Sequence, residues 1–324
     1  VELEARDPSG RPVFLRRAAD DLVADRPEEA AAMAMLYRNR VEFGVGHGVA
    51  VDWDVSPDDP QRATRLVSSA IPQAEVAKMT PRAAGDDPRL GGLVLDMKAL
   101  ADASPPQLGA MLAPLTSAYL AWIEERSAAV AAGQDGLAAH RKAGVAALDR
   151  CRRSARRIGE GLALLAADPA AAEAFRFANR AMALQRVHSL LAEARARGED
   201  VGLPELDVAK NRTWYPFQLG FILQALPGLT RLDHPDRSAS PEAIADLLWF
   251  PTGGGKTEAY LGLAAYTLAL RRLQGLVEGR RGDVGVAVLM RYTLRVLTIQ
   301  QFQRATALLC ACEVIRKEAL AKGD

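Results

Sequence analysis

The spacing of apolar residues changes along this chain and divides it into three regions. Residues 1–95 are mixed, and within them residues 41–53 alternate apolar with small or polar side chains, which predicts strands interrupted by glycines. Residues 96–210 carry apolar residues at helical spacing and are expected to form three helices between residues 104 and 200. In residues 211–324, helical stretches alternate with short, continuous apolar runs. The pattern therefore predicts a small mixed α/β part, a mostly helical part and an α/β part.

The order of elements in the third region indicates its fold class. The apolar runs 244–250 and 284–290 have the length and composition of buried parallel strands. Each run precedes an expected helix, over about 256–273 and 293–321, and a short helix is expected earlier, at 217–226. Strand, helix, strand and helix in succession are typical of an α/β fold with a parallel sheet.

A glycine-rich loop joins the first apolar run to its helix, with the sequence Pro251-Thr252-Gly253-Gly254-Gly255-Lys256-Thr257-Glu258. Glycines let backbone N–H groups approach a polyphosphate, and the start of the following helix adds a positive dipole end. Lys256 is expected to reach the β- and γ-phosphates, and the Thr257 hydroxyl to coordinate Mg²⁺. We refer to residues 251–257 as the phosphate loop. It predicts ATP and Mg²⁺ as cofactors bound by residues 252–258, Glu258 included, with catalytic roles for Lys256 and Thr257.

The loop departs from the general pattern at one position, where Phe250 stands in place of Gly or Ala. The alternative interpretation is a glycine-rich turn with a chance Gly-Lys-Thr. The flanking strand, helix and second strand all fall where a phosphate loop requires them, so they favour a nucleotide site.

Residues 251–258 resemble motif I of superfamily-two helicases. Residues 248–261, with the bulky Phe250 included, look most like the loop of the large helicase of the bacterial DISARM anti-phage defence system. The run Leu289-Met290-Arg291-Tyr292-Thr293-Leu294-Arg295, followed by Gln300-Gln301-Phe302, looks like the next motif of that family. The resemblance is strongest over residues 211–310, and before residue 200 it depends mainly on residues 44–48. It implies that residues 211–324 are the first half of a truncated RecA-like ATPase lobe.

The resemblance also assigns residues beyond the loop. Trp214-Tyr215-Pro216-Phe217-Gln218 is similar to the upstream glutamine motif, which implies that the Gln218 amide contacts adenine. The gap to Lys256 is longer than usual, and the loop at 230–241 is the expected insertion. The alternative is a polar residue at a helix start.

The segment after the second apolar run is similar to helicase motif Ia, with Tyr292 for proline and one extra residue. This implies that Arg291, Thr293 and Gln300 bind the nucleic-acid backbone, and Arg295 lies one helical turn beyond Arg291. The alternative for these side chains is helix capping and surface charge.

Composition limits the class of protein. About half of the residues are apolar and 25% are charged, as in a globular protein, and the net charge of +1 shows no overall preference for nucleic acid. Three cysteines cannot form a disulfide framework, and no apolar run is long enough to cross a bilayer. We therefore expect a cytoplasmic protein that does not enter a membrane.

Both ends of the chain look cut, since no initiator Met is present and no acidic Mg²⁺-binding box follows the second run. A second motor lobe and an arginine finger are also missing. Asp246 precedes the loop and is not suited to the role of that acidic box. We expect this chain alone to be inactive and the intact protein to be a larger ATPase.

Four other features have ordinary structural interpretations that we favour. They are a solvated helix face for Arg150, Arg153 and Arg157, a core position for Phe175, structural thiols for Cys310 and Cys312, and a turn for His47. The alternatives are a phosphate-tracking face for the arginines, base stacking for the aromatic segment, a metal site for the thiols and catalysis for the histidine.

These observations predict the front part of an ATP-dependent DNA helicase or translocase in anti-phage defence. Its expected partners are DNA and a protein of the same defence system. Two alternatives remain open: a P-loop ATPase that remodels protein, and a non-catalytic interaction module that binds nucleotide.

Overall fold

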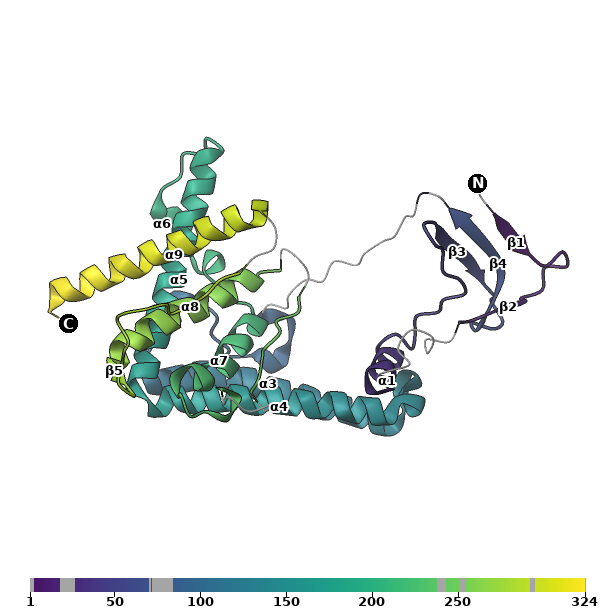
Figure 1. The fold of residues 1–324 in the computed structure, drawn as a ribbon, viewed down its shortest axis with the longest axis horizontal. Coiled ribbons are helices and arrows are strands. Elements are labelled where there is room, and N and C mark those ends of the chain that lie inside the picture. Colours follow the sequence, from purple (N-terminus) through teal and green to yellow (C-terminus); the bar gives the residue numbers. More distant parts are fainter. Residues whose placement is uncertain are drawn as a thin grey trace. The chain divides into compact units, whose positions relative to one another are not determined.

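The computed structural model describes residues 3–17, 27–69, 71, 84–237, 243–250, 254–291 and 295–323. The described part is mixed α/β and mostly helical, with only small sheets (Figure 1). The chain divides into two compact units, Val1–Lys78 with Trp122–Arg152, and Met79–Ala121 with Arg153–Asp324. These units cut across the three regions seen in the sequence, because the two long helices α3 (Pro105–Ala132) and α4 (Arg141–Ala167) each contribute residues to both.

The first unit contains an antiparallel sheet. Its strands are β1 (Glu4–Arg6), β2 (Phe14–Leu15), β3 (Ala50–Val55) and β4 (Arg62–Ser69), and β4 pairs with each of the other three. Helix α1 spans Pro27–Leu36 in the same unit. Ala63 is fully buried on β4, and Phe43 packs its ring edge against Trp53, with centroids 5.9 Å apart.

The strand prediction for residues 41–53 was right only in its second half. Residues 50–53 lie in β3, but residues 41–45 form no strand, and Phe43 contributes its side chain to the core instead. Strand β4 was not predicted. Apolar and polar residues alternate only weakly within β4. This strand nevertheless supplies the hydrogen-bond partners for β3.

The three long helices predicted between residues 104 and 200 are confirmed. They are α3 (Pro105–Ala132), α4 (Arg141–Ala167) and α5 (Pro169–Ala196). Gly133 and Gly136 lie between α3 and α4 and separate the two helices. Their φ values of 68° and 76° are positive, which other residues rarely adopt. Asp168 caps α5 by accepting a hydrogen bond from the Ala171 N–H at 3.0 Å.

Helix α5 lies at the centre of the second unit. It packs against α2 (Met97–Asp102), α8 (Lys256–Gln274) and α9 (Arg295–Lys322), and α8 also packs against α7 (Pro216–Thr230). Figure 1 shows α8 and α9 beside α5. Phe175 and Tyr266 are fully buried in this core, which confirms the core interpretation of Phe175. None of the helices in the described part of the chain has the length and hydropathy needed to span a bilayer.

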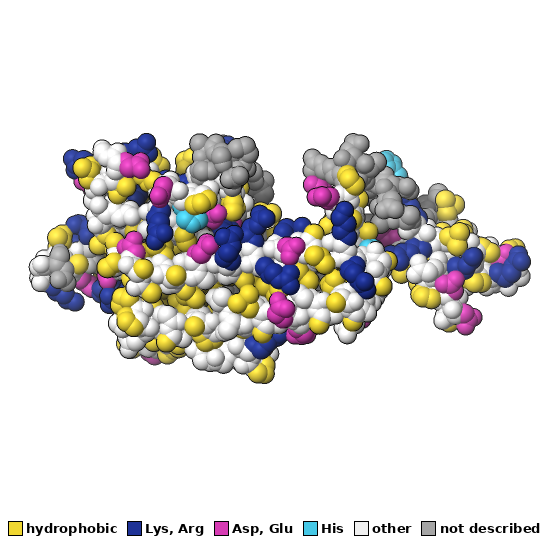
Figure 2. Space-filling model, turned by 90° about the horizontal axis from the view of Figure 1, so that it is seen from below, with side chains coloured by type: hydrophobic (Ala, Val, Ile, Leu, Met, Phe, Trp, Pro, Cys, Tyr) yellow, Lys and Arg dark blue, Asp and Glu magenta, His cyan; other side chains and the backbone are white. Residues whose placement is uncertain are grey.

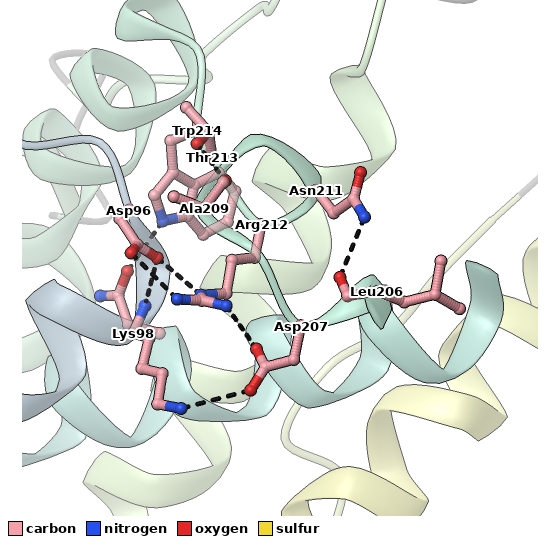
Figure 3. A network of polar contacts seen from close by, with 10 residues as sticks. Asp96, Lys98, Leu206, Asp207, Ala209, Asn211, Arg212, Thr213 and Trp214 are labelled. Atoms are coloured by element: carbon pink, nitrogen blue, oxygen red, sulfur yellow. Dashed lines mark hydrogen bonds and ion pairs between the residues drawn. The ribbon is translucent and has the colours of Figure 1, made fainter. Parts of the chain in front are cut away.

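An ion-pair network fixes the backbone just before α7 (Figure 3). The buried Arg212 donates from Nε to Asp96 at 2.9 Å and also pairs with Asp207. Asp96 caps α2, so this arginine joins two segments that are 116 residues apart in sequence. Trp214 adds a buried hydrogen bond from its indole N–H to Asn179 on α5, at 2.8 Å. The start of α7 is therefore held from two sides.

The two predicted parallel strands are absent from the described residues. Residues 243–250 and 284–291 form no regular secondary structure, and the only strands that the structure describes after residue 211 are those of the short hairpin β5 (Leu276–Val277) and β6 (Arg280–Arg281). Large apolar side chains on both runs are exposed, including Leu247 at 84% and Val286 at 80%. A strand needs a neighbouring strand for its backbone hydrogen bonds, and neither run has one among the described residues. The expectation of a parallel sheet is therefore not confirmed among the described residues.

Candidate functional site

The described part of the phosphate loop has the backbone that its glycines suggest. Gly254 and Gly255 lead directly into α8, whereas Pro251, Thr252 and Gly253 lie outside the described residues. Gly255 has a φ of 88°, and a Cβ there would lie 2.6 Å from Nε2 of Gln218. Glycine is therefore required at this position for both conformational and steric reasons.

Lys256 and Thr257 are the first two residues of α8, where backbone N–H groups have no partner within the helix. The ammonium group of Lys256 donates to the backbone oxygen of Phe250, so the side chain reaches across the loop from its end to its beginning. Thr257 is half-buried in the same first turn. These two predicted ligands of ATP and Mg²⁺ thus lie together at a helix N-terminus, which attracts anions.

Gln218 lies against the loop, although it is 37 residues away in sequence. The side chain is almost fully buried, and its Nε2 donates to the Gly255 oxygen at 2.7 Å. Its Oε1 accepts from the Tyr215 N–H at 2.8 Å, which closes the first turn of α7. The contact with adenine stays a prediction, and the structure adds a contact with the loop that the sequence did not suggest.

The bulky residue at position 250 belongs to a column of aromatic rings. Phe250 stacks on Phe217 with centroids 4.5 Å apart and planes 5° apart. Phe217 in turn stacks on Tyr215, at 6.0 Å and 11°. Stacked aromatic pairs of this kind stabilise beyond the area that they bury. Phe250 departs from the usual small residue because its ring has a specific partner at the start of α7.

Two neighbouring residues of α7 therefore hold the two ends of the loop. Phe217 packs against Phe250, just before the loop, and Gln218 bonds to Gly255, near its end. The α7 start is itself fixed by Arg212 and Trp214. The start of α7 therefore contacts the positions on either side of residues 251–253.

Glu258, in the first turn of α8, pairs with Arg304 of α9. Its Oε1 accepts from Nη2 of Arg304, and its Oε2 would lie 3.6 Å from a Cβ placed on Gly255. Both side chains are more than two-thirds buried, at 20% and 31% exposed. Its carboxylate thus lies beside the loop and is held by a charge from a second helix.

Arg157 corrects the prediction for the basic run on α4. Its side chain is only 7% exposed and does not lie on a solvated face. It donates two hydrogen bonds to Asp246, at 2.6 and 2.8 Å, and one to Asp236 at 2.7 Å. The bonds to Asp246 raise the pKa of the guanidinium above its ordinary value. Asp246 lies in the run that leads into the loop, so α4 anchors that run at its start. Arg150 and Arg153 are exposed, as expected.

The residues predicted to contact nucleic acid are only partly described. Arg291 and Gln300 are exposed, Thr293 lies outside the described residues, and Arg295 begins α9 with its side chain not described. On the face drawn in Figure 2, Lys and Arg side chains lie among Asp and Glu side chains. This mixture agrees with the net charge of +1. The contacts with nucleic acid stay predictions.

The cysteines show no sign of a shared site. Cys310 is exposed and Cys312 is buried, and burial raises the pKa of the Cys312 thiol to about 11. Within the described residues, no group of three or more His, Cys, Asp or Glu side chains could hold a metal ion. His47 is exposed in a bend of the chain, close to the turn that was predicted.

The sequence missed three contributors to the site, namely Arg157, Phe217 and Arg304. Each acts through a partner more than 30 residues away. Only Phe217 had a signal, because it precedes Gln218 and the unusual Phe250 needed a partner. Arg157 was visible only as part of a basic run.

No protein-family profile matches the chain. The chain is 36% identical over 297 residues to a protein named DISARM protein DrmA from Bacillus paralicheniformis. The match covers 89% of this chain and 25% of that protein, so the chain spans about a quarter of the length of the curated relative. Over these matched residues, the chain is a DrmA-like protein.

Proposed function

We propose that this chain is the front part of an ATP-dependent DNA helicase or translocase that acts in DISARM anti-phage defence. In this proposal, ATP and Mg²⁺ bind at the phosphate loop, and the intact protein converts hydrolysis into movement along DNA. A protein of the same defence system is its proposed partner. The similarity to DrmA supports the defence role.

One observation carries the nucleotide-binding part of the proposal. The loop is held at both ends by the adjacent residues Phe217 and Gln218, and it opens directly into the N-terminus of α8. Gly255 is in a conformation that leaves no room for a side chain. A chance glycine-rich turn would need no such support. Backbone N–H groups at a helix start, with fixed residues on either side of the loop, are what a polyphosphate requires.

The residues present fit the proposed ligands. Lys256 would exchange its bond to the Phe250 oxygen for phosphate oxygens, and the amides at the start of α8 would orient them. Thr257 would hold Mg²⁺ through its hydroxyl. The metal ion supplies charge neutralisation on the phosphates when it is bound. In this proposal, the acidic box and the arginine finger come from parts of the intact protein outside this chain.

A RecA-like lobe is also part of the proposal. The apolar runs 244–250 and 284–290 flank the loop and its helix in the order that such a lobe requires. Both runs leave large apolar side chains exposed and backbone groups without strand partners in the described residues. Strands from elsewhere in the intact protein would bury these runs and complete the sheet. The DrmA relative is about four times as long as its matched part, which leaves room for such strands in that protein.

The deciding experiment is an ATPase assay on the intact protein, with and without DNA and with the Lys256→Ala variant. We expect turnover that DNA stimulates and that the substitution removes. ATP turnover that DNA leaves unchanged would favour a protein-remodelling ATPase. Nucleotide binding without any turnover would favour a non-catalytic module, and loss of both would contradict the proposed function.

A further inference from the structure

Glu258 and Arg304 link the phosphate loop to the helix that follows the second apolar run. Glu258 lies one residue after Thr257, and its second carboxylate oxygen lies beside Gly255. Arg304 belongs to α9, one helical turn beyond Gln300 and on the same side of the helix. The two helices also share buried apolar contacts, with Leu261 of α8 and Leu308 of α9 in one core.

The position of Glu258 poses an electrostatic problem. A carboxylate within a few ångströms of the loop would repel a bound polyphosphate, and the repulsion is strong where water is partly excluded. The Glu258 side chain is only 20% exposed, so water screens its charge less than it screens that of a surface carboxylate. A positive partner that both neutralises the carboxylate and holds it to one side removes most of this cost. Arg304 is placed to do both.

We propose that Arg304 is a positioning residue that acts through Glu258, and that this ion pair couples nucleic acid bound at the start of α9 to ATP turnover. The inference rests on the proposed ATPase function and goes beyond it by naming the link between the two sites. A helix moves as a rigid element, so a nucleic-acid strand held at Gln300 of α9 shifts Arg304 relative to Glu258. The carboxylate then moves toward or away from the loop.

The structure offers a matched control on the same helix. Arg316 pairs with Glu313 at 2.7 Å, but both residues belong to α9 and are exposed. Arg316→Gln therefore removes an arginine and an ion pair from α9 without touching α8. Its ATP turnover and its stimulation by DNA should equal those of the unmodified protein.

The test measures ATP turnover by the intact protein over a range of ATP concentrations, with and without DNA. Arg304→Gln should raise KM for ATP about five- to tenfold, since Glu258 then faces the phosphates unpaired. It should also reduce the ratio of stimulated to basal kcat by a similar factor. The double variant Glu258→Gln with Arg304→Gln should bring KM back toward the unmodified value without restoring the stimulation. A purely structural role for the pair would produce no such separation.

Three outcomes would overturn the inference about Arg304. Equal KM and equal stimulation for Arg304→Gln and Arg316→Gln would overturn the inference, and so would a double variant with the same KM as Arg304→Gln.

If melting curves show that Arg304→Gln does not fold, Arg304→Lys replaces it. Lys keeps the charge and loses the guanidinium fork, so KM should stay near normal while stimulation falls; unchanged stimulation would overturn the inference. An intact protein that neither binds nor hydrolyses ATP would instead refute the proposed function, whatever the arginine variants do.

Discussion

Helix α8 and the apolar run just before it differ in how far their apolar side chains are buried. The helix buries Leu261, Tyr266 and Leu270 against α5 and α7, whereas the run at 243–250 leaves Leu247 and Trp249 in solvent. A helix makes its backbone hydrogen bonds internally and needs a neighbour only for its apolar face. A strand needs a neighbour for both. The difference teaches that this chain contains the partners of its helices but, within the described residues, not those of its predicted strands.

The largest expected difference between the apolar runs and α8 is in the rate at which their backbone amides exchange hydrogen. In this chain, amides of residues 244–250 and 284–290 should exchange at least about a hundredfold faster than those in the middle of α8. In the intact protein, the same amides should become protected, because added strands would accept their hydrogen bonds. Mass spectrometry of proteolytic fragments measures both. Slow exchange of these runs in the isolated chain would show that they already have strand partners.

Lys256→Ala tests whether the start of α8, the packed member of this comparison, binds nucleotide. In the intact protein we expect weaker ATP binding and a loss of turnover of about a hundredfold or more, because the positive charge facing the phosphates is gone. The fold should persist, since the Lys256 ammonium group donates to a backbone oxygen, that of Phe250, and Lys256 is not among the fully buried core residues. Fluorescent-nucleotide titration and a turnover assay measure the two effects.

The isolated chain supplies the control for this variant. It should show negligible turnover with or without the substitution. Measurable hydrolysis that Lys256→Ala removes would reveal a catalytic carboxylate within the chain that we have not identified.

Arg157→Ala should release the run at 243–250 from the helices. The substitution leaves Asp236 and Asp246 without their buried cation, and breaking such a pair costs about 3 kcal/mol of the free energy of unfolding. The neighbouring Arg156→Ala is a close control, because Arg156 makes an exposed pair with Glu160 on its own helix. That control should cost under about 0.5 kcal/mol. Urea denaturation compares the two, and equal losses would mean that Arg157 is not an anchor.

Arg291→Ala should give the smallest effect, at the end of the second apolar run. Binding of nucleic acid by the intact protein should weaken about equally across sequences, and the slope of log K against log salt should fall by about 1. Basal ATP turnover should survive, while its stimulation falls. Affinities at several salt concentrations, together with a melting curve, provide the measurement. A lower melting temperature with an unchanged salt slope would assign Arg291 to the fold instead.

Helices were the part of the fold that could be predicted. The sequence indicated a helix over 256–273, and the structure has one at 256–274; a helix expected at 217–226 extends over 216–230. Capping residues and apolar spacing are local signals, which a single sequence contains in full. The short antiparallel sheet was predicted only in part, because β4 is defined by the partners that it pairs with.

By itself, the sequence determined the glycine-rich segment, its place before α8 and the helices around it, since each depends on neighbouring residues. Only the tertiary structure decided that Gln218 bonds to Gly255, that Phe250 stacks on Phe217, and that Arg304 pairs with Glu258. It also decided that Arg157 is buried among carboxylates and not exposed with its neighbouring arginines. These contacts join segments 33 to 89 residues apart. Their energies depend on burial and geometry, which the spacing of residues along a chain does not contain.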